Sequence, residues 1–358
     1  MQIIRPASHP YHKKRMIKRI NEAKDIPSFY YALSHVWGLS EENRYLWNEI
    51  GDYVDDEEGQ SAAPVPMRPE KRNTLLSMLK DHPDSYWWID VLCARTDTPL
   101  DIMGDIYACC LECVVMIDCE PDLIPQINAI MSDSVDQSLG GTQQDYKKLR
   151  QQLNVGAKLL QCTWWTRVWT WQEMALPFGE LRFVAETGTH RPTSNTMTLK
   201  KLIEVKDRGL LIPFKHHTRE SMSARAKFDS IMTEILSARK SNRYRIMGRS
   251  KVALTFLITS LGETARQCMD PADYVYGALG MLQIKIPRMK DTNAVWQRFL
   301  TELDNCIKLE DGHRFIDYAQ EFDLRKAYNA SNVYIKLSLY LEENAEVYSL
   351  TVKDGLFE

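Results

Sequence analysis

The sequence has no long apolar run and no large excess of charge of either sign. No stretch of about 18 apolar residues, the length that a membrane-spanning helix needs, occurs in the 358 residues. The formal net charge is -3, which gives the whole chain no electrostatic attraction to nucleic acid or to an anionic membrane. The first twenty residues lack the apolar core of a secretory signal peptide. We therefore expect a cytoplasmic protein without a membrane partner, and nucleic acid is not an expected partner.

The eight cysteines do not follow the spacing of a disulfide framework or of a metal site. Several lie in apolar segments, as reduced thiols do in the cytosol. Four of them fall between residues 109 and 119, but they lack the paired C-x-x-C knuckles of a zinc site. We expect no bound metal. A nucleophilic role for Cys93 stays open, because it needs a histidine that only the fold can bring close.

Apolar strand segments alternate with helical segments over the first half of the chain. Residues 29–38 (FYYALSHVWG) carry apolar side chains on both alternating faces, which predicts a buried parallel strand. Strands that alternate with helices imply right-handed crossovers and a parallel sheet, so we predict an α/β fold. Further strands are predicted at 86–93, 112–118 and 180–186, and helices at 68–84, 99–110, 145–162 and 164–176.

The pattern changes after about residue 190. The later signals are mostly helical, and only 332–343 (NVYIKLSLYLEE) and 346–352 (EVYSLTV) resemble strands. We therefore divide the chain into an α/β domain, residues 1–190, and a mostly helical C-terminal region, residues 191–358. A basic run at 239–251 is best interpreted as a solvated helix end and loop, with contact to phosphates as the alternative.

Four of the nine tryptophans lie in the ten residues WWTRVWTWQE (164–173), which end on a carboxylate. Wound as one helix over 164–176, the apolar side chains span an arc of roughly 160°, which predicts a core-facing helix. Gln172 falls near the centre of that arc, so we expect its amide to be buried and hydrogen-bonded. Glu173 falls just beyond Trp169 at the rim, where partial desolvation would raise its pKa. A catalytic carboxylate and a solvated edge residue both fit this pattern.

Small and polar residues gather where the first two predicted strands end. In open α/β sheets the ligand crevice lies beyond the carboxyl ends of the strands, which here read SHVWG (34–38) and DVLC (90–93). Ser34 and His35 are adjacent on a strand and must point to opposite faces. They cannot form a nucleophile–base pair by themselves, which argues against a simple serine hydrolase.

Three blocks of the sequence resemble, in order and spacing, the fungal heterokaryon incompatibility (HET) domain family. They are YYALSHVWG (30–38), WWIDVLC followed by MGDIYACC (87–110), and WWTRVWTWQEMALP (164–177). A fourth block, RQCMDPADYVYGALGM (266–281), resembles a segment often seen downstream in such chains. The loop CARTDTPLD (93–101) departs from the family's usual Cys-Ile-Asn-Gln and acidic stretch, so a pocket shaped by this loop would differ from the family's.

The resemblance implies a role in non-self recognition and programmed cell death. HET domains are similar to TIR domains, which implies a flavodoxin-like parallel sheet flanked by helices. It also implies NAD glycohydrolase activity, with NAD as substrate and no separate cofactor, in a form that becomes active as a homo-oligomer. By that match Glu173 is the catalytic carboxylate and Asp90 takes the place of an Asp on the second strand. The alternative is a non-catalytic module that oligomerises and recruits partners, among them an upstream recognition protein.

Under the enzyme hypothesis, Glu173 stabilises the positive charge that develops on the ribose as nicotinamide leaves. Tryptophans beside it would exclude water and offer flat surfaces to a ring. The substrate-binding residues that this hypothesis predicts are Ser34, His35, Trp37, Gly38, Asp90, Cys93, Arg167 and Trp169.

Overall fold

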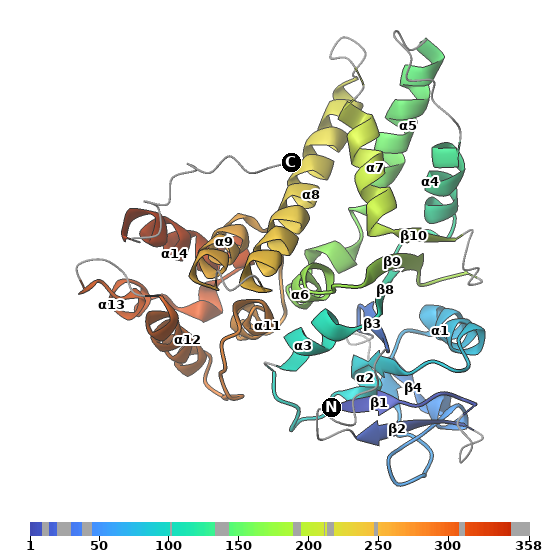
Figure 1. The fold of residues 1–358 in the computed structure, drawn as a ribbon, viewed down its shortest axis with the longest axis horizontal. Coiled ribbons are helices and arrows are strands. Elements are labelled where there is room, and N and C mark those ends of the chain that lie inside the picture. The colour runs from blue at the N-terminus through green and yellow to red at the C-terminus, as the bar shows by residue number, and fades with distance from the viewer. Residues whose placement is uncertain are drawn as a thin grey trace. The chain divides into compact units, whose positions relative to one another are not determined.

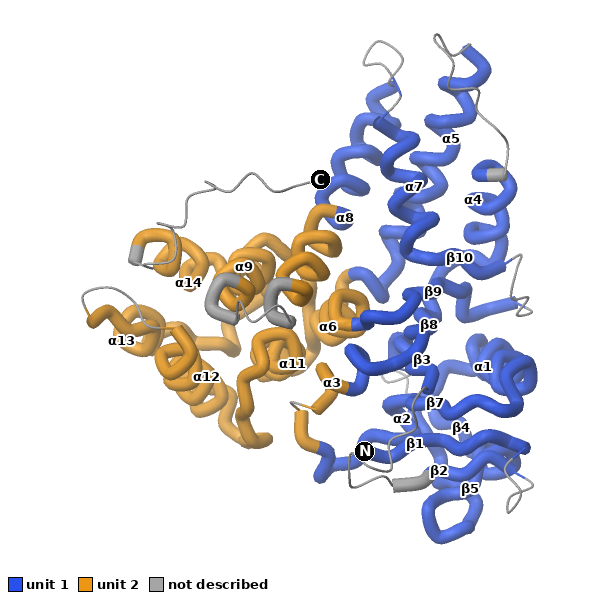
Figure 2. The backbone as a smooth tube through the Cα atoms, viewed as in Figure 1, with its two compact units in different colours: residues 1–98, 106–165, 177–232 blue, residues 99–105, 166–176, 233–358 orange. Residues whose placement is uncertain are grey.

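The computed structural model divides the chain into two compact units (Figure 2). Unit 1 comprises residues 1–98, 106–165 and 177–232, and unit 2 comprises residues 99–105, 166–176 and 233–358. The domain boundary near residue 190 stays a prediction. The residues that the structure describes are 1–8, 14–19, 30–37, 45–100, 102–132, 143–188, 195–210, 212, 218–246, 250–307 and 312–344.

Unit 1 is built around an eight-stranded sheet with the strand order β10-β9-β8-β3-β7-β1-β2-β5 (Figure 1). Its four central strands are parallel, which confirms the predicted α/β class. Most of their side chains are buried, as expected for parallel strands covered on both faces. The central strands are β3 (Tyr31–His35), β7 (Trp87–Ile89), β8 (Glu112–Ile117) and β9 (Glu180–Ala185).

The flanking strands lie outside the predicted strand segments and make the sheet mixed. β1 pairs antiparallel with both β7 and β2, and β10 pairs antiparallel with β9, whereas β5 pairs parallel with β2. These strands are β1 (Gln2–Ile4), β2 (Arg15–Arg19), β5 (Val54–Asp55) and β10 (Thr196–Thr198), and a separate two-stranded sheet contains β4 (Leu46–Trp47) and β6 (Val65–Pro66).

The predicted strand at residues 86–93 is too long. β7 ends at Ile89, and α2 (Asp90–Cys93) follows it directly as one helical turn. The carbonyl oxygen of Asp90 accepts a hydrogen bond from the amide of Ala94 at 2.7 Å, which closes this turn and takes the chain out of the sheet. Asp90 therefore lies just beyond the carboxyl end of the strand and not within it.

Helices connect and cover the strands of unit 1 (Figure 1). The predicted helices at 68–84, 99–110 and 145–162 are confirmed by α1, α3 and α5. α4, α5 and α7 pack on one another beside β9 and β10. The bounds are α1 (Pro69–Asp81), α3 (Ile102–Cys109), α4 (Leu123–Ser132), α5 (Gln143–Leu159), α7 (Leu199–Leu210) and α8 (Arg219–Ile246), with 3-10 helices η2 (Asn48–Asp52) and η3 (Thr163–Thr166). α3 and α8 contribute residues to both units.

Unit 2 is helical, as the sequence predicts for the C-terminal region. Its most extensive helix packing joins α9 to α14. Within the described ranges, every helix falls short of the combination of length and hydropathy that a membrane crossing requires. The helices are α6 (Trp169–Ala175), α9 (Ser250–Glu263), α10 (Asp273–Tyr276), α11 (Leu279–Leu282), α12 (Thr292–Cys306), α13 (Phe315–Ala319), η6 (Leu324–Lys326) and α14 (Ala330–Asn344).

The predicted strand at residues 332–343 is wrong, because this segment lies within α14. Its apolar side chains fit both a period of two and a helical period, and tertiary packing selects the helix. The backbone of Gly262 on α9 approaches Ile335 so closely that an added methyl carbon would lie 3.2 Å from its Cα. Ser331 also donates a hydrogen bond to the carbonyl oxygen of Gly262 at 2.6 Å. The predicted strand at 346–352 lies outside the described residues.

The tryptophan segment 164–176 is not one helix. η3 ends at Thr166, and α6 begins only at Trp169. Between them the amide of Val168 donates to the carbonyl oxygen of Gln267 at 3.0 Å, and the amide of Gln267 donates to that of Thr166 at 2.6 Å. This strand-like pairing uses backbone groups that a continuous helix would bond internally, and it separates the first two tryptophans from α6.

Candidate functional site

The strand order β9-β8-β3-β7 creates a topological switch point between β3 and β8. From β3 the chain continues to β7 on one side and then returns to β8 on the other side. In sheets of this kind ligands bind in the crevice beyond the carboxyl ends of the strands, where the order reverses. His35 ends β3, Asp90 follows β7, Asp118 follows β8 and Glu186 follows β9.

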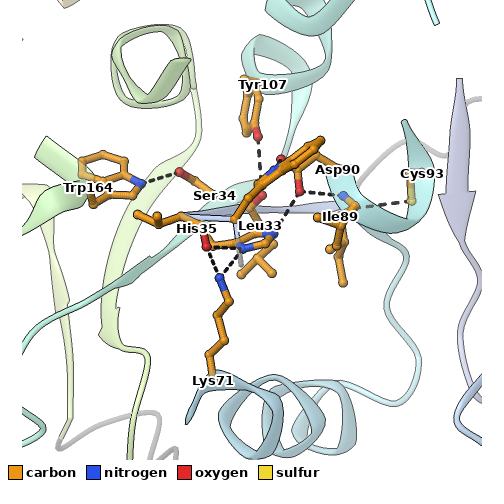
Figure 3. A network of polar contacts seen from close by, with 12 residues as sticks. Leu33, Ser34, His35, Lys71, Ile89, Asp90, Cys93, Tyr107 and Trp164 are labelled. Atoms are coloured by element: carbon orange, nitrogen blue, oxygen red, sulfur yellow. Dashed lines mark hydrogen bonds and ion pairs between the residues drawn. The ribbon is translucent and has the colours of Figure 1, made fainter. Parts of the chain in front are cut away.

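A chain of buried polar side chains crosses these strand ends (Figure 3). Nζ of Lys71 donates to Nδ1 of His35 at 2.8 Å, and Nε2 of His35 lies 2.9 Å from Oδ1 of Asp90. Lys71 also donates to the carbonyl oxygen of Val36, and Trp37 donates its indole N–H to the second carboxylate oxygen of Asp90. Because Nδ1 accepts from an amino group, we infer the neutral tautomer of His35 with its proton on Nε2.

Lys71 reaches this position because α1 carries it on the apolar face. The buried residues of α1 are Lys71, Thr74, Leu75, Met78 and Leu79, which are spaced as one helical stripe. The lysine stands in the first turn of the helix, after Pro69. This first turn lies at the carboxyl end of β3, where the amine meets His35. A lysine within the apolar stripe of a predicted helix is the sequence feature that could have indicated this contact.

Burial governs the protonation of the three bonded side chains Lys71, His35 and Asp90. It lowers the pKa of Lys71 to about 8, against the opposing charge of Glu186. Burial also lowers the pKa of His35, and the charge of Lys71 lowers it further. Burial alone would raise the pKa of Asp90, but the interaction with His35 and the hydrogen bonds from Trp37 and a backbone amide hold it below its ordinary value. At neutral pH Lys71 is therefore an ammonium, His35 a neutral imidazole and Asp90 a carboxylate.

A partly buried ion pair lies near Lys71. Arg68, directly before α1, donates from one guanidinium nitrogen to both carboxylate oxygens of Glu186. Burial raises the pKa of Glu186, while the charges of Arg68 and Lys71 oppose that rise. Two cations, Lys71 and Arg68, thus face the two carboxylates at the strand ends: Arg68 bonds directly to Glu186, and Lys71 reaches Asp90 through His35.

Ser34 and Cys93 do not join this network. Ser34 points to the opposite side of β3, as predicted, and its hydroxyl oxygen accepts the indole N–H of Trp164 at 2.8 Å (Figure 3). The sulfur of Cys93 accepts from the amide of Ile89 at 3.5 Å, and burial raises the pKa of the thiol to about 12. Cys93 is thus a protonated thiol at neutral pH, which does not favour a nucleophilic role. Gly38 lies outside the described residues.

Glu173 lies in unit 2 and is more deeply buried than the helical projection predicts. Its exposed fraction is 5%, whereas Trp169, one turn earlier on α6, is half-buried. Trp169 and Glu173 are four residues apart and therefore lie on the same side of α6, with Cβ atoms roughly 5–6 Å apart. Gln172 is fully buried as predicted, but neither atom of its amide has a hydrogen-bond partner among the described residues.

The downstream block at residues 266–281 holds α6 in place. The buried guanidinium of Arg266 donates to the carbonyl oxygen of Arg167 at 3.0 Å and to the hydroxyl of Thr170 at 2.8 Å. Gly277 packs so closely on the start of α6 that an added methyl carbon would lie 2.5 Å from a methyl carbon of Val168. In the same block, burial raises the pKa of Asp273 to about 6, and the side chain of Trp169 opposes that rise.

Residues 30–173 match the family model described as Heterokaryon incompatibility protein (HET). This range of the chain is similar to a HET domain. The matched range begins one residue before β3 and ends on Glu173, so it includes both the polar chain of unit 1 and most of α6. No curated protein and no solved structure matched the chain. The HET domain supports a role in heterokaryon incompatibility and cell death.

Within the matched range, the structure brings together some of the predicted site residues. His35, Trp37 and Asp90 share one network, and sequence reasoning missed the Lys71 that completes it. Arg167, Trp169 and Glu173 belong to unit 2, where the missed residue is Asp273. No group of three or more His, Cys, Asp or Glu side chains in the described ranges is placed to hold a metal ion.

Proposed function

We propose that this protein is a HET-domain effector that hydrolyses NAD at the bond between nicotinamide and ribose when it is activated or assembled. The observation that carries the proposal is the buried carboxylate of Glu173, on the same side of α6 as a half-buried tryptophan. A fixed carboxylate stabilises a developing cation far more strongly in a water-poor surrounding than in bulk water.

The proposed reaction needs one carboxylate and no general acid. The bond between C1′ of the ribose and the ring nitrogen of nicotinamide breaks, and its electron pair neutralises the positively charged ring. The ribose becomes oxocarbenium-like, and Glu173 stabilises this charge or orients the ribose hydroxyls. Water then forms the new bond to C1′ and loses a proton, which gives ADP-ribose, and nicotinamide is released unprotonated.

The polar network of unit 1 holds the ring of Trp37 in a fixed orientation. The ring of Trp37 is 39% exposed, while its indole N–H is bound to the buried carboxylate of Asp90. Asp90 is fixed in turn by His35 and Lys71. We propose that His35, Lys71 and Asp90 present this indole as an oriented surface for an aromatic ring.

The test is release of nicotinamide from NAD by the purified full chain, separated by chromatography. We expect Glu173→Gln to abolish release and Glu263→Gln, a change of an exposed glutamate in unit 2, to leave it unchanged. Circular dichroism and the unfolding midpoint establish that both variants fold. Turnover that survives Glu173→Gln in a folded protein removes Glu173 from the mechanism. Turnover per protein molecule, measured at several protein concentrations, tests assembly. If only an oligomer is active, this rate rises steeply with protein concentration.

A second candidate function is assembly without catalysis. It is favoured by two large apolar side chains that α14, packed on α9, leaves exposed: Ile335 is 37% and Leu339 48% exposed. Ile335 and Leu339 are four residues apart and share one side of α14. We propose a second copy of the chain as the partner of these side chains. Leu339→Glu should then lower the molecular mass measured by light scattering, whereas an unchanged mass contradicts this interface.

A further inference from the structure

Unit 2 contains a pocket that shares no residue with the polar chain of unit 1 or with α6. Its volume is about 370 Å³, and it lies where α12, α13, η6 and α14 come together. All four of these elements belong to unit 2. Small-ligand sites in proteins have volumes of about 300–1000 Å³. The pocket lies at the lower end of this range, which favours a ligand of one or two rings.

Aromatic and aliphatic side chains form much of the pocket wall. Trp296 and Leu337 are buried and Phe322 is half-buried, and all three line the pocket. The ring centroids of Trp296 and Phe322 lie 5.6 Å apart. Tyr318, another lining residue, is 46% exposed and stacks on Tyr340 with ring centroids 4.0 Å apart. The pocket therefore offers ring surfaces to a ligand.

Two side-chain hydrogen bonds fix this wall before any ligand binds. The indole N–H of Trp296 donates to the carbonyl oxygen of Ala319 at 2.9 Å. The side-chain amide of the next residue, Gln297, donates to the carbonyl oxygen of Gln320 at 2.7 Å. Both bonds tie α12 to the end of α13, where the lining segment that leads to Phe322 begins. A ligand therefore meets a wall that is already ordered.

Two lysines at the pocket have no partner of their own. Lys326 and Lys336 line it and are exposed, and neither makes a hydrogen bond or an ion pair with another residue in the described part of the chain. Two carboxylates also line it, Glu321 and Asp323. Asp323 accepts hydrogen bonds from the guanidinium of Arg325 at 2.8 and 3.1 Å, which compensates its charge. Two ammonium groups thus stand against one uncompensated carboxylate.

These features match an aromatic ring that carries an anionic group. Aromatic side chains bind a further ring through stacked or edge-to-face contacts, and ammonium groups donate charge-assisted hydrogen bonds to carboxylates. We propose that this pocket binds a small aromatic carboxylate, with its ring against Phe322 and Tyr318 and its carboxylate at Lys326 and Lys336. The proposal is independent of NAD cleavage, because the pocket contains none of the residues assigned to that reaction.

The experiment measures binding to the full chain by calorimetry with three probes. They are indole-3-propionate, tryptamine and propionate. Tryptamine has the same ring with an ammonium group, and propionate has the same acid group without a ring. We expect indole-3-propionate to bind and the other two to bind at least about tenfold more weakly, because each lacks one of the two kinds of contact.

Variants locate the bound probe. Lys326→Met and Lys336→Met keep the length of the side chain without its charge and should each weaken binding of indole-3-propionate up to about fivefold, as for a solvent-exposed ion pair. Tyr318→Ala removes a ring of the wall and should weaken it by a similar factor. Lys290→Met and Tyr328→Ala change an exposed lysine and an exposed tyrosine of unit 2 outside the pocket and should leave the affinity unchanged.

Each outcome supports or overturns the proposal. Weaker binding in the three pocket variants, with unchanged binding in the two control variants, supports it whatever the nicotinamide assay gives. Equal binding of tryptamine and indole-3-propionate would overturn the role of the lysines, and equal binding of propionate would show non-specific attraction of anions. Absence of saturable binding of indole-3-propionate by the folded wild-type chain would overturn the site itself.

Discussion

The buried amine of Lys71 gives the protein a predictable dependence of stability on pH. The side chain is fully buried, and its pKa falls from 10.5 to about 8. Each pKa unit corresponds to about 1.36 kcal/mol, so keeping the charged form in the folded state costs about 3 kcal/mol relative to the unfolded chain. Below about pH 8 both states are protonated and this cost applies in full. Between pH 8 and 10.5 the unfolded lysine binds a proton that the folded one has lost, so the contribution of Lys71 to stability rises with pH.

Lys71→Met removes this dependence because methionine has similar length and no charge. The free energy of unfolding, measured in urea from pH 7.5 to 10, should rise less in the variant than in the wild type, by up to about 3 kcal/mol. Other groups that titrate in this range are common to both proteins and cancel in the difference. Lys80→Met changes an exposed lysine of the same helix and should run parallel to the wild type. If the Lys71→Met curve is also parallel, the amine is not buried in the folded protein and the reasoning fails.

Three further predictions concern packing and reactivity. Ser34→Ala leaves the buried indole N–H of Trp164 without its acceptor and should lower the free energy of unfolding by about 1–3 kcal/mol, measured in urea. Gly179→Ala would place a methyl carbon inside the contact distance of the carbonyl oxygen of Leu111, so we expect a loss of about 3 kcal/mol and a lower unfolding midpoint. Cys93 should resist iodoacetamide at pH 8 in the native protein, as read by mass spectrometry, and rapid labelling there would contradict its burial and raised pKa.

The α10 carboxyl group adds a pH prediction of opposite sign. Burial raises the pKa of Asp273 from 3.8 to about 6. Between these values the folded state binds a proton that the unfolded state has lost, so stability falls as pH rises from about 4 to 6. Asp273→Asn keeps a side-chain oxygen near Trp169 but removes the ionisable carboxyl group. The free energy of unfolding of this variant should therefore change less between about pH 4 and 6 than that of the wild type. A variant curve that falls as steeply as the wild type would contradict this assignment.

The strands at the centre of the sheet could be predicted because their apolar pattern is unambiguous. The segment at 29–38 is apolar on both faces, and a chain of that composition forms a buried strand in almost any context. The segment at 332–343 is different, because its apolar residues fit a strand and a helix equally well. Its packing on α9 decides in favour of the helix, and residues about seventy positions earlier in the sequence make that contact.

The sequence by itself determined the α/β class, the helical character of the C-terminal region, the HET blocks and the opposite orientations of Ser34 and His35. These follow from periodicity and from local backbone geometry, which act over a few neighbouring residues. Only the tertiary structure decided that Lys71 meets His35, that α6 starts at Trp169, and that Arg266 bonds to Thr170. Such contacts join segments between about 35 and 100 residues apart, and their energies depend on burial, which no local pattern specifies.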